Sequence, residues 1–146
     1  MNTDLAWFAG VFDGEGSVVI GRSGGKYKLA LSLVSVSREL IDRVKEIAGG
    51  RIITVYPKNA RRTTWMWQLT GIEKIQRFLK QIFPFLTAKA KPAAIALVYP
   101  IVSRGGKVGR VGHNIHPLAR LLQEECYKAI RFVNQGFQPF TEEFES

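Results

Sequence analysis

An apolar segment near the N-terminus has helical spacing and ends in two acids, Asp13 and Glu15. The C-terminus of a helix carries partial negative charge, so carboxylates are disfavoured there unless a cation compensates them. Ala6, Gly10 and Gly14 recur every four residues, which places three small residues on one face of the same helix. Because Gly inside a helix costs about 1 kcal/mol relative to Ala, this stripe indicates a second helix that packs very close. Two such helices would bring two carboxylates together, which suits a divalent metal ion.

The same segment carries a family resemblance. Residues 8–16 read FAGVFDGEG and resemble the signature motif of the LAGLIDADG homing endonucleases, with small, apolar and acidic residues in register. Two strand–strand–helix units follow, and then a Pro84-Phe85-Leu86 turn and a lysine-bearing segment, as in single-motif members. An ordinary core helix with a glycine cap is the alternative, but it leaves both acids and Gly10 unexplained. The resemblance implies an α+β fold in the order αββαββα, with a saddle-shaped antiparallel four-stranded sheet and extra C-terminal helices.

The length of 146 residues predicts a single domain with one core. Its core is expected at about 3–100, with a C-terminal helical extension at about 101–136 and an acidic tail at 141–146. That tail holds three of the 12 acids, so the remainder, with 21 basic residues and 9 acids, carries 21 − 9 = +12. A pI near 10 on a chain with 46% apolar residues points to a polyanionic partner. A basic protein with a merely solvated surface has the same composition, so charge alone does not decide.

Cysteine usage and hydropathy bear on the compartment. The single cysteine, Cys126, excludes an internal disulfide and a cysteine-rich zinc site, and it suits a reducing compartment. No apolar run approaches 18 residues, and the first residues lack a basic-then-apolar signal pattern. We therefore expect a soluble intracellular protein with no membrane partner, in an organelle, the cytoplasm or the nucleus.

Apolar periodicity and turn residues predict the order of the elements. Helices are expected at about 4–13, 38–48, from the 70–73 region to 82, 88–99 and 117–134, and strands at about 16–22, 26–36, 51–56 and 63–69. Thr3 is the expected N-cap of the first helix. Thr70 and Glu73 have the spacing of a capping box that opens the third helix. By parity, Trp65 and Trp67 are expected in the core or an interface rather than stacked on bases.

The second predicted strand has one wet and one buried face. Lys28, Ala30 and Ser32 alternate with the leucines at 29, 31 and 33, so the polar side is the one that would meet nucleic acid. A strand of this length spans on the order of 30 Å at ~3.3 Å per residue, which is about one turn of B-DNA. One subunit would thus read roughly one half-site, through side chains in the major groove.

Candidate contacts follow from strand parity and from proximity to the strand ends. They are Lys28, Ser32, Arg62 and Gln68 by parity, with Arg22, Lys26 and Arg61 near the ends. Gln can pair bidentately with adenine, and Arg with guanine. For any single Lys or Arg, a solvated charge is an equally good interpretation. Their clustering on one predicted face favours contact, largely with phosphate.

Phosphodiester hydrolysis requires a hard divalent cation, Mg²⁺ or another hard divalent cation, to polarise the phosphate and to generate a nucleophile from water. The resemblance implies that Glu15 is the metal ligand, with the Gly14 carbonyl beside it. Asp13, the other catalytic-motif acid, is expected to orient or cap rather than to ligate. Lys89 matches the family's lysine near the scissile phosphate, where a cation stabilises developing charge. Lys91 is the neighbouring competitor for that role.

One stretch departs from the family pattern. Relatives often place a Gln and a basic residue after the second strand, whereas residues 35–39 read SVSRE, without Gln. Ser37 or Arg38 could substitute for them. This departure leaves a second function open, a maturase-like or regulatory nucleic-acid-binding protein that kept the fold and lost cleavage.

A single motif per chain bears on assembly, because the family's two-helix interface needs two motifs. The resemblance therefore implies a homodimer through the face formed by Ala6, Gly10 and Gly14. A C₂ dimer would read a roughly palindromic site and place one Glu15 near each scissile phosphate. The leading prediction is a metal-dependent, site-specific, homodimeric double-strand DNA endonuclease of mobile introns (intron homing). The target sequence, and intron RNA as a second ligand, are left open.

Overall fold

The computed structural model describes residues 2–23, 26–56, 62–101, 110–111, 114–115 and 117–134. The elements are α1 (Thr3–Glu15), β1 (Gly16–Ser23), β2 (Lys26–Ser35), α2 (Arg38–Ala48), β3 (Arg51–Val55), β4 (Thr64–Thr70), α3 (Ile72–Ile82), the 3₁₀ helix η1 (Phe83–Phe85), α4 (Ala90–Leu97), β5 (Arg110–Val111), β6 (Asn114–Ile115) and α5 (Pro117–Asn134). β1 to β4 form an antiparallel sheet in the order β1-β2-β4-β3, and β5 pairs with β6. The predicted α+β fold, with its αββαββα order and C-terminal helices, is confirmed.

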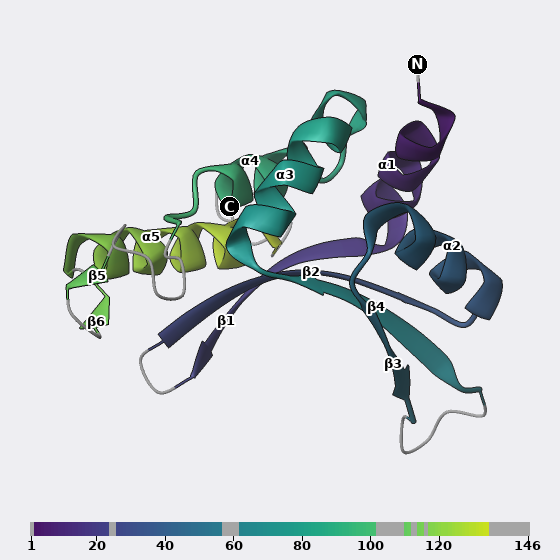
Figure 1. The fold of residues 1–146 in the computed structure, drawn as a ribbon, viewed down its shortest axis with the longest axis horizontal. Coiled ribbons are helices and arrows are strands. Elements are labelled where there is room, and N and C mark those ends of the chain that lie inside the picture. The colour runs from purple at the N-terminus through teal and green to yellow at the C-terminus, as the bar shows by residue number, and fades with distance from the viewer. Residues whose placement is uncertain are drawn as a thin grey trace, which may run out of the picture.

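The four-stranded sheet is arched, and the helices lie on one side of it. In Figure 1, α1 to α5 lie above the sheet, while the β1–β2 and β3–β4 hairpins curve downward at its two ends. The described helices therefore leave the lower, concave face of the sheet uncovered (Figure 1). Among the described residues, no helix combines the length and the apolar character that a membrane span requires.

Aromatic side chains fix the helix layer to the sheet. Phe8 of α1 packs edge-on against Trp67 of β4, with ring centroids 5.4 Å apart, and against Phe78 of α3 at 4.7 Å. The Trp67 indole N–H donates to the Gly49 carbonyl at 2.6 Å, so its one polar group is satisfied in the core. Trp67 is fully buried, as predicted, whereas Trp65 is only partly buried.

The side chains of β2 alternate between the two faces of the sheet as predicted, but one residue of the predicted wet face is buried. Leu29, Leu31 and Leu33 are buried against the helices, while Lys28 is exposed on the concave face. Ala30, which we expected to be wet, is 7% exposed. Its single methyl group lies on a central strand between β1 and β4, so the neighbouring strands cover it.

Two helix starts differ from the expected ones. The N-cap of α1 is Asn2, whose side chain accepts from the backbone N–H of Asp4 at 3.0 Å, so the Thr3 prediction is wrong. Asn is a stronger N-cap than Thr and stands one residue earlier. The Thr70–Glu73 capping box is also wrong: Thr70 stays in β4, and Gly71, at φ 99°, precedes α3 without a side-chain cap. Sheet pairing of Thr70 with Ala30 prevails over the local capping signal.

A buried glutamine joins α3 to the end of α4. The Gln76 amide nitrogen donates to the carbonyl oxygens of Ala96 at 3.0 Å, Leu97 at 3.3 Å and Tyr99 at 2.9 Å. The last carbonyls of a helix have no intrahelical partner, and Gln76 supplies one. α4 is shorter than expected, ending at Leu97. This anchor holds α4, and with it the lysine-bearing segment that precedes α4, against the core.

Candidate active site and nucleic-acid interface

The Asp13 carboxylate binds the backbone of a distant segment. Its Oδ1 accepts from the N–H of Thr87 at 3.1 Å and of Lys89 at 2.9 Å, and its Oδ2 accepts from Thr87 at 2.9 Å. Lys89 is the residue immediately before α4. Both Asp13 oxygens are therefore engaged in capping the turn that leads into α4, and this turn is fixed to the end of α1.

The Glu15 carboxylate, unlike that of Asp13, does not cap a backbone segment of the described chain. Glu15 is the last residue of α1, it is exposed, and no described residue forms a hydrogen bond or ion pair with its carboxylate. The last turn of α1 contains no basic residue, so the negative helix end is uncompensated there. Gly14 is exposed beside it, and its carbonyl belongs to the last turn, where carbonyls lack intrahelical partners.

The donor set that one chain offers to a metal ion is small. Among the described residues, no group of three or more His, Cys, Asp or Glu side chains is placed to hold an ion. The Glu15 carboxylate and the Gly14 carbonyl are oxygen donors of the kind that Mg²⁺ and Ca²⁺ take. They fit a hard divalent cation as part of a donor set, which other oxygen atoms must complete.

The small-residue stripe lies on the surface. Gly10 and Gly14 are exposed, Ala6 is half-buried, and a Cβ built on either glycine meets no atom within 4 Å. Packing within the described chain therefore does not require small residues at these positions. The stripe remains available to a partner along the outer face of α1.

Four side chains form a polar row across the concave face of the sheet. Cross-strand pairing aligns Ser17 with Ser32, Ser32 with Gln68, and Gln68 with Arg51. A neighbouring row is apolar and aligns Val34, Met66 and Ile53. Val34 is 43% exposed, so this row also faces solvent.

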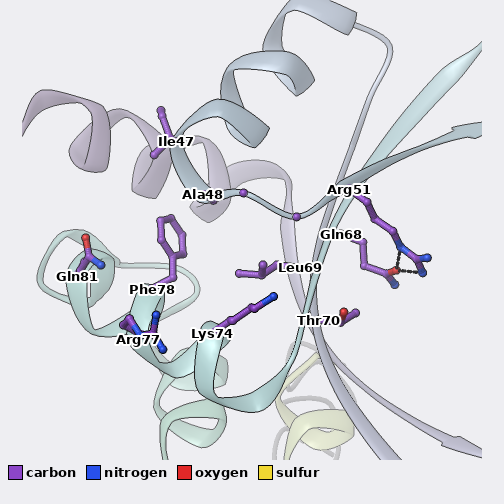
Figure 2. A pocket seen from close by; sticks show the side chains of 12 residues that line it. Ile47, Ala48, Arg51, Gln68, Leu69, Thr70, Lys74, Arg77, Phe78 and Gln81 are labelled. Atoms are coloured by element: carbon purple, nitrogen blue, oxygen red, sulfur yellow. Dashed lines mark hydrogen bonds between the residues drawn. The ribbon is translucent and has the colours of Figure 1, made fainter.

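Arg51 and Gln68 are bonded to each other within the polar row. Arg51 Nε and Nη2 donate to Gln68 Oε1 at 3.0 Å and 2.6 Å. Both residues also line a hollow of about 610 Å³, together with the end of α2 and residues of α3. Figure 2 shows their side chains on the other side of the strands from Leu69, Phe78 and Lys74, which line the same hollow. Our list of predicted contacts omits Arg51. The sequence does place Arg51 at the start of a strand, directly after Gly49 and Gly50. Only the pairing of β3 with β4 shows that Arg51 lies beside Gln68.

The other predicted contact residues lie in different places. Lys26 and Lys28 are exposed on β2, and Arg62 is exposed just before β4. Arg22 points to the helix side, with its guanidinium 5.6 Å from the ring of Tyr127 in α5, because it pairs with Tyr27 on the face opposite Lys28. Arg61 and the acidic tail at 141–146 lie outside the described residues.

The stretch that departs from the family pattern serves local structure. Ser35 Oγ accepts from the Ser37 N–H at 3.0 Å, and Ser37 Oγ caps α2 by accepting from Leu40 at 3.2 Å. Arg38 pairs with Asp42 at 2.9 Å. The two residues that could substitute for the missing Gln therefore both have intrachain partners.

Comparison with known proteins gives one family-model match and several structural matches. A family model described as a LAGLIDADG-like domain matches residues 2–82. Among curated proteins, no sequence matches the chain. The homing endonuclease I-CvuI, solved in complex with the I-CreI target in the presence of 2 mM Mg with the DNA not cleaved, superposes with a TM-score of 0.62 at 15% identity, over 91% of this chain and 81% of that one. The archaeal intron-encoded homing endonuclease I-Vdi141I, complexed with DNA, gives 0.52 at 16% identity, over 91% and 98%. At these identities the superpositions establish a shared fold.

Proposed function

Because the chain belongs to the LAGLIDADG-like domain family, we propose that it is a site-specific DNA endonuclease that uses a divalent metal ion and acts as a homodimer. The observation that carries this proposal is the different placement of the two motif acids. Asp13 is saturated by backbone N–H groups, whereas Glu15 is exposed and unpaired within the described chain. A carboxylate at a negative helix end is disfavoured by about 0.3–1 kcal/mol, so the unpaired Glu15 is the acid whose charge a bound cation would compensate.

Glu15 and the Gly14 carbonyl would hold the cation, and Glu15 of a second copy would contribute to the same centre. When bound, such an ion polarises the scissile phosphate and makes coordinated water more acidic. The negative end of α1 favours the arrival of a cation at Glu15. Lys89 supplies positive charge from the turn that Asp13 fixes to α1, where it stabilises the charge that develops on the phosphate.

The concave face of the sheet would lie along duplex DNA. Its polar row and the exposed Lys26 and Lys28 offer base-reading and phosphate-binding groups, and a net charge of +9 favours a polyanion. A twofold axis along the α1 faces doubles this surface and gives a roughly palindromic site. The exposure of Gly10 and Gly14, with open space above both, supports this interface.

A second function is favoured by a specific observation. Ser37 and Arg38 are engaged in capping and pairing α2, so neither is free to take the place of the missing Gln. A protein that binds DNA with this sheet and does not cut it is therefore the alternative.

One experiment separates the two functions. The protein is incubated with a randomised duplex library, with Mg²⁺ or with EDTA, and both the bound duplexes and the cut ends are sequenced. An endonuclease yields cut ends with a common flanking sequence in Mg²⁺ and none in EDTA. A binder yields an enriched bound sequence without cut ends. If neither pool is enriched over the input library, both functions are refuted.

A further inference from the structure

The hydrogen bonds between Arg51 and Gln68 leave the pair with donors and no free side-chain acceptor. The two guanidinium N–H groups occupy both lone pairs of the Gln68 amide oxygen. They also fix the orientation of the amide, because a flipped amide would set its NH₂ against the guanidinium, donor against donor. What the pair still presents is therefore made only of donors: the Gln68 NH₂ and the remaining guanidinium N–H groups.

The position of the pair allows it to meet a base. Arg51 is exposed and Gln68 is half-buried, and cross-strand pairing places both in one row with Ser32 on the concave side of the sheet. No described residue accepts a hydrogen bond from Gln68 Nε2, so its donors are free for a ligand on this face.

The four bases differ in what they show to such a pair. In the major groove guanine presents two neighbouring acceptors, N7 and O6, whereas adenine places its N6 donor beside N7. Cytosine presents the N4 donor, and thymine has one acceptor beside its methyl group. Only guanine matches two adjacent donors, because the N6 donor of adenine and the N4 donor of cytosine repel them and thymine offers a single acceptor. A lone Gln, with its oxygen free, would instead match adenine.

We propose that Arg51 and Gln68 act as one donor-only reader that selects guanine at a single base pair of each half-site, with Arg51 setting the specificity of Gln68. This inference rests on the proposed function, because it requires duplex DNA on the concave face. It assigns a specificity-determining role to Arg51 and reverses the base that Gln68 would select on its own.

The test uses the full chain and selection of bound duplexes from a randomised library. The parent is expected to select guanine at one position of each half-site. Arg51→Ala frees the Gln68 oxygen, so the preference at that position is expected to move to adenine by at least about five-fold, since a good bidentate contact discriminates by about 1 kcal/mol or more. Arg77→Ala removes the same charge from the α3 side of the hollow, away from the Arg51–Gln68 pair (Figure 2), and is expected to leave the base profile unchanged.

Base analogues test the same contact without altering the protein. Replacing the selected guanine by 7-deazaguanine removes N7 and is expected to weaken binding by the parent at least about five-fold. Inosine keeps both N7 and O6 and is expected to bind like guanine. Gln68→Glu keeps an acceptor for Arg51 but lacks the amide donors, so it should lose the guanine preference. This second variant tests the inference if Arg51→Ala does not fold.

The results distinguish the inference from the function on which it rests. A guanine preference retained in Arg51→Ala, or one that relaxes without a gain of adenine, overturns the paired reader. Equal binding of 7-deazaguanine and guanine overturns it as well. If the parent enriches no sequence at all, the proposed DNA-binding function itself fails.

Discussion

Opposite phenotypes are expected for the two motif acids, although they stand only two residues apart. Asp13→Ala should destabilise the fold, because Thr87 and Lys89 lose the carboxylate that accepts from their N–H groups. Glu15→Gln should leave the fold intact and abolish cleavage, because it keeps the shape of the side chain and removes the charged metal ligand. The comparison is internally matched, since both changes remove one negative charge from the end of α1.

The size of the Asp13 effect follows from its hydrogen bonds. Two N–H groups lose a charged acceptor, one of them in a partly buried bond. Hydrogen bonds to charged groups contribute about 1.5–3 kcal/mol each, and the more exposed one counts for less, so the loss should be about 2–4 kcal/mol. For a chain of this size that is a drop in Tm of about 6–12 °C. Asp13→Asn keeps an acceptor oxygen and should fall between the parent and Asp13→Ala.

Glu15→Gln is expected to melt no lower than the parent without metal. The change removes a negative charge from a negative helix end and breaks no hydrogen bond within the described residues. The assays are thermal melting with and without Mg²⁺, gel-shift binding, and nicking of the selected duplex. Binding should persist in Glu15→Gln while nicking disappears. A Glu15→Gln protein that melts well below the parent yet still cuts would refute the mechanism, as would an Asp13→Ala protein that melts with the parent.

Four further outcomes are expected. Open space surrounds position 10 within the chain, so the Gly10→Leu protein should keep the Tm of the parent while sedimenting as a monomer and losing cleavage. A Gly10→Leu dimer that still cuts DNA would refute the α1 interface. Lys28→Ala should weaken binding to all sequences alike and lower the slope of log K against log salt by about one per chain, while Arg77→Ala leaves the slope unchanged. Replacing thymine by uracil should weaken binding where a methyl group meets the Val34 row, and Val34→Ser should remove that difference; equal sensitivity in both proteins would show that the row does not contact bases. Burial raises the pKa of the Cys126 thiol, so its alkylation at pH 8 should be several-fold slower in the folded protein than in urea; equal rates would show an accessible thiolate.

Elements with strong local signals were predicted closely. The bounds of α2 and α5 match the expected ones, and each strand of the main sheet lies within one residue of its predicted bounds. In α2, an N-cap serine precedes an amphipathic run that a pair of glycines ends, so propensity, capping and burial agree. Where they disagree, the tertiary structure decides, as Thr70 demonstrates by pairing with Ala30 instead of capping α3.

In the candidate site, too, local features could be predicted from the sequence and long-range contacts could not. The motif acids could be found from the sequence because their chemistry is anomalous locally, at a helix end that disfavours them. Their division of roles depends on a segment more than 70 residues away, since Asp13 accepts from Thr87 and Lys89. No local pattern encodes that contact.

Base readout depends on the register of the strands. Alternation assigned Lys28, Ser32 and Gln68 to the correct face, because parity is a property of one strand. The chemistry of Gln68 is instead a property of a pair, and its partner Arg51 becomes its neighbour only through the order β2-β4-β3. A shift of one residue between β3 and β4 would turn Arg51 toward the helices and leave Gln68 free to read adenine. On the proposed readout, the base that this face would select is therefore determined by strand pairing as much as by the residues on the concave face.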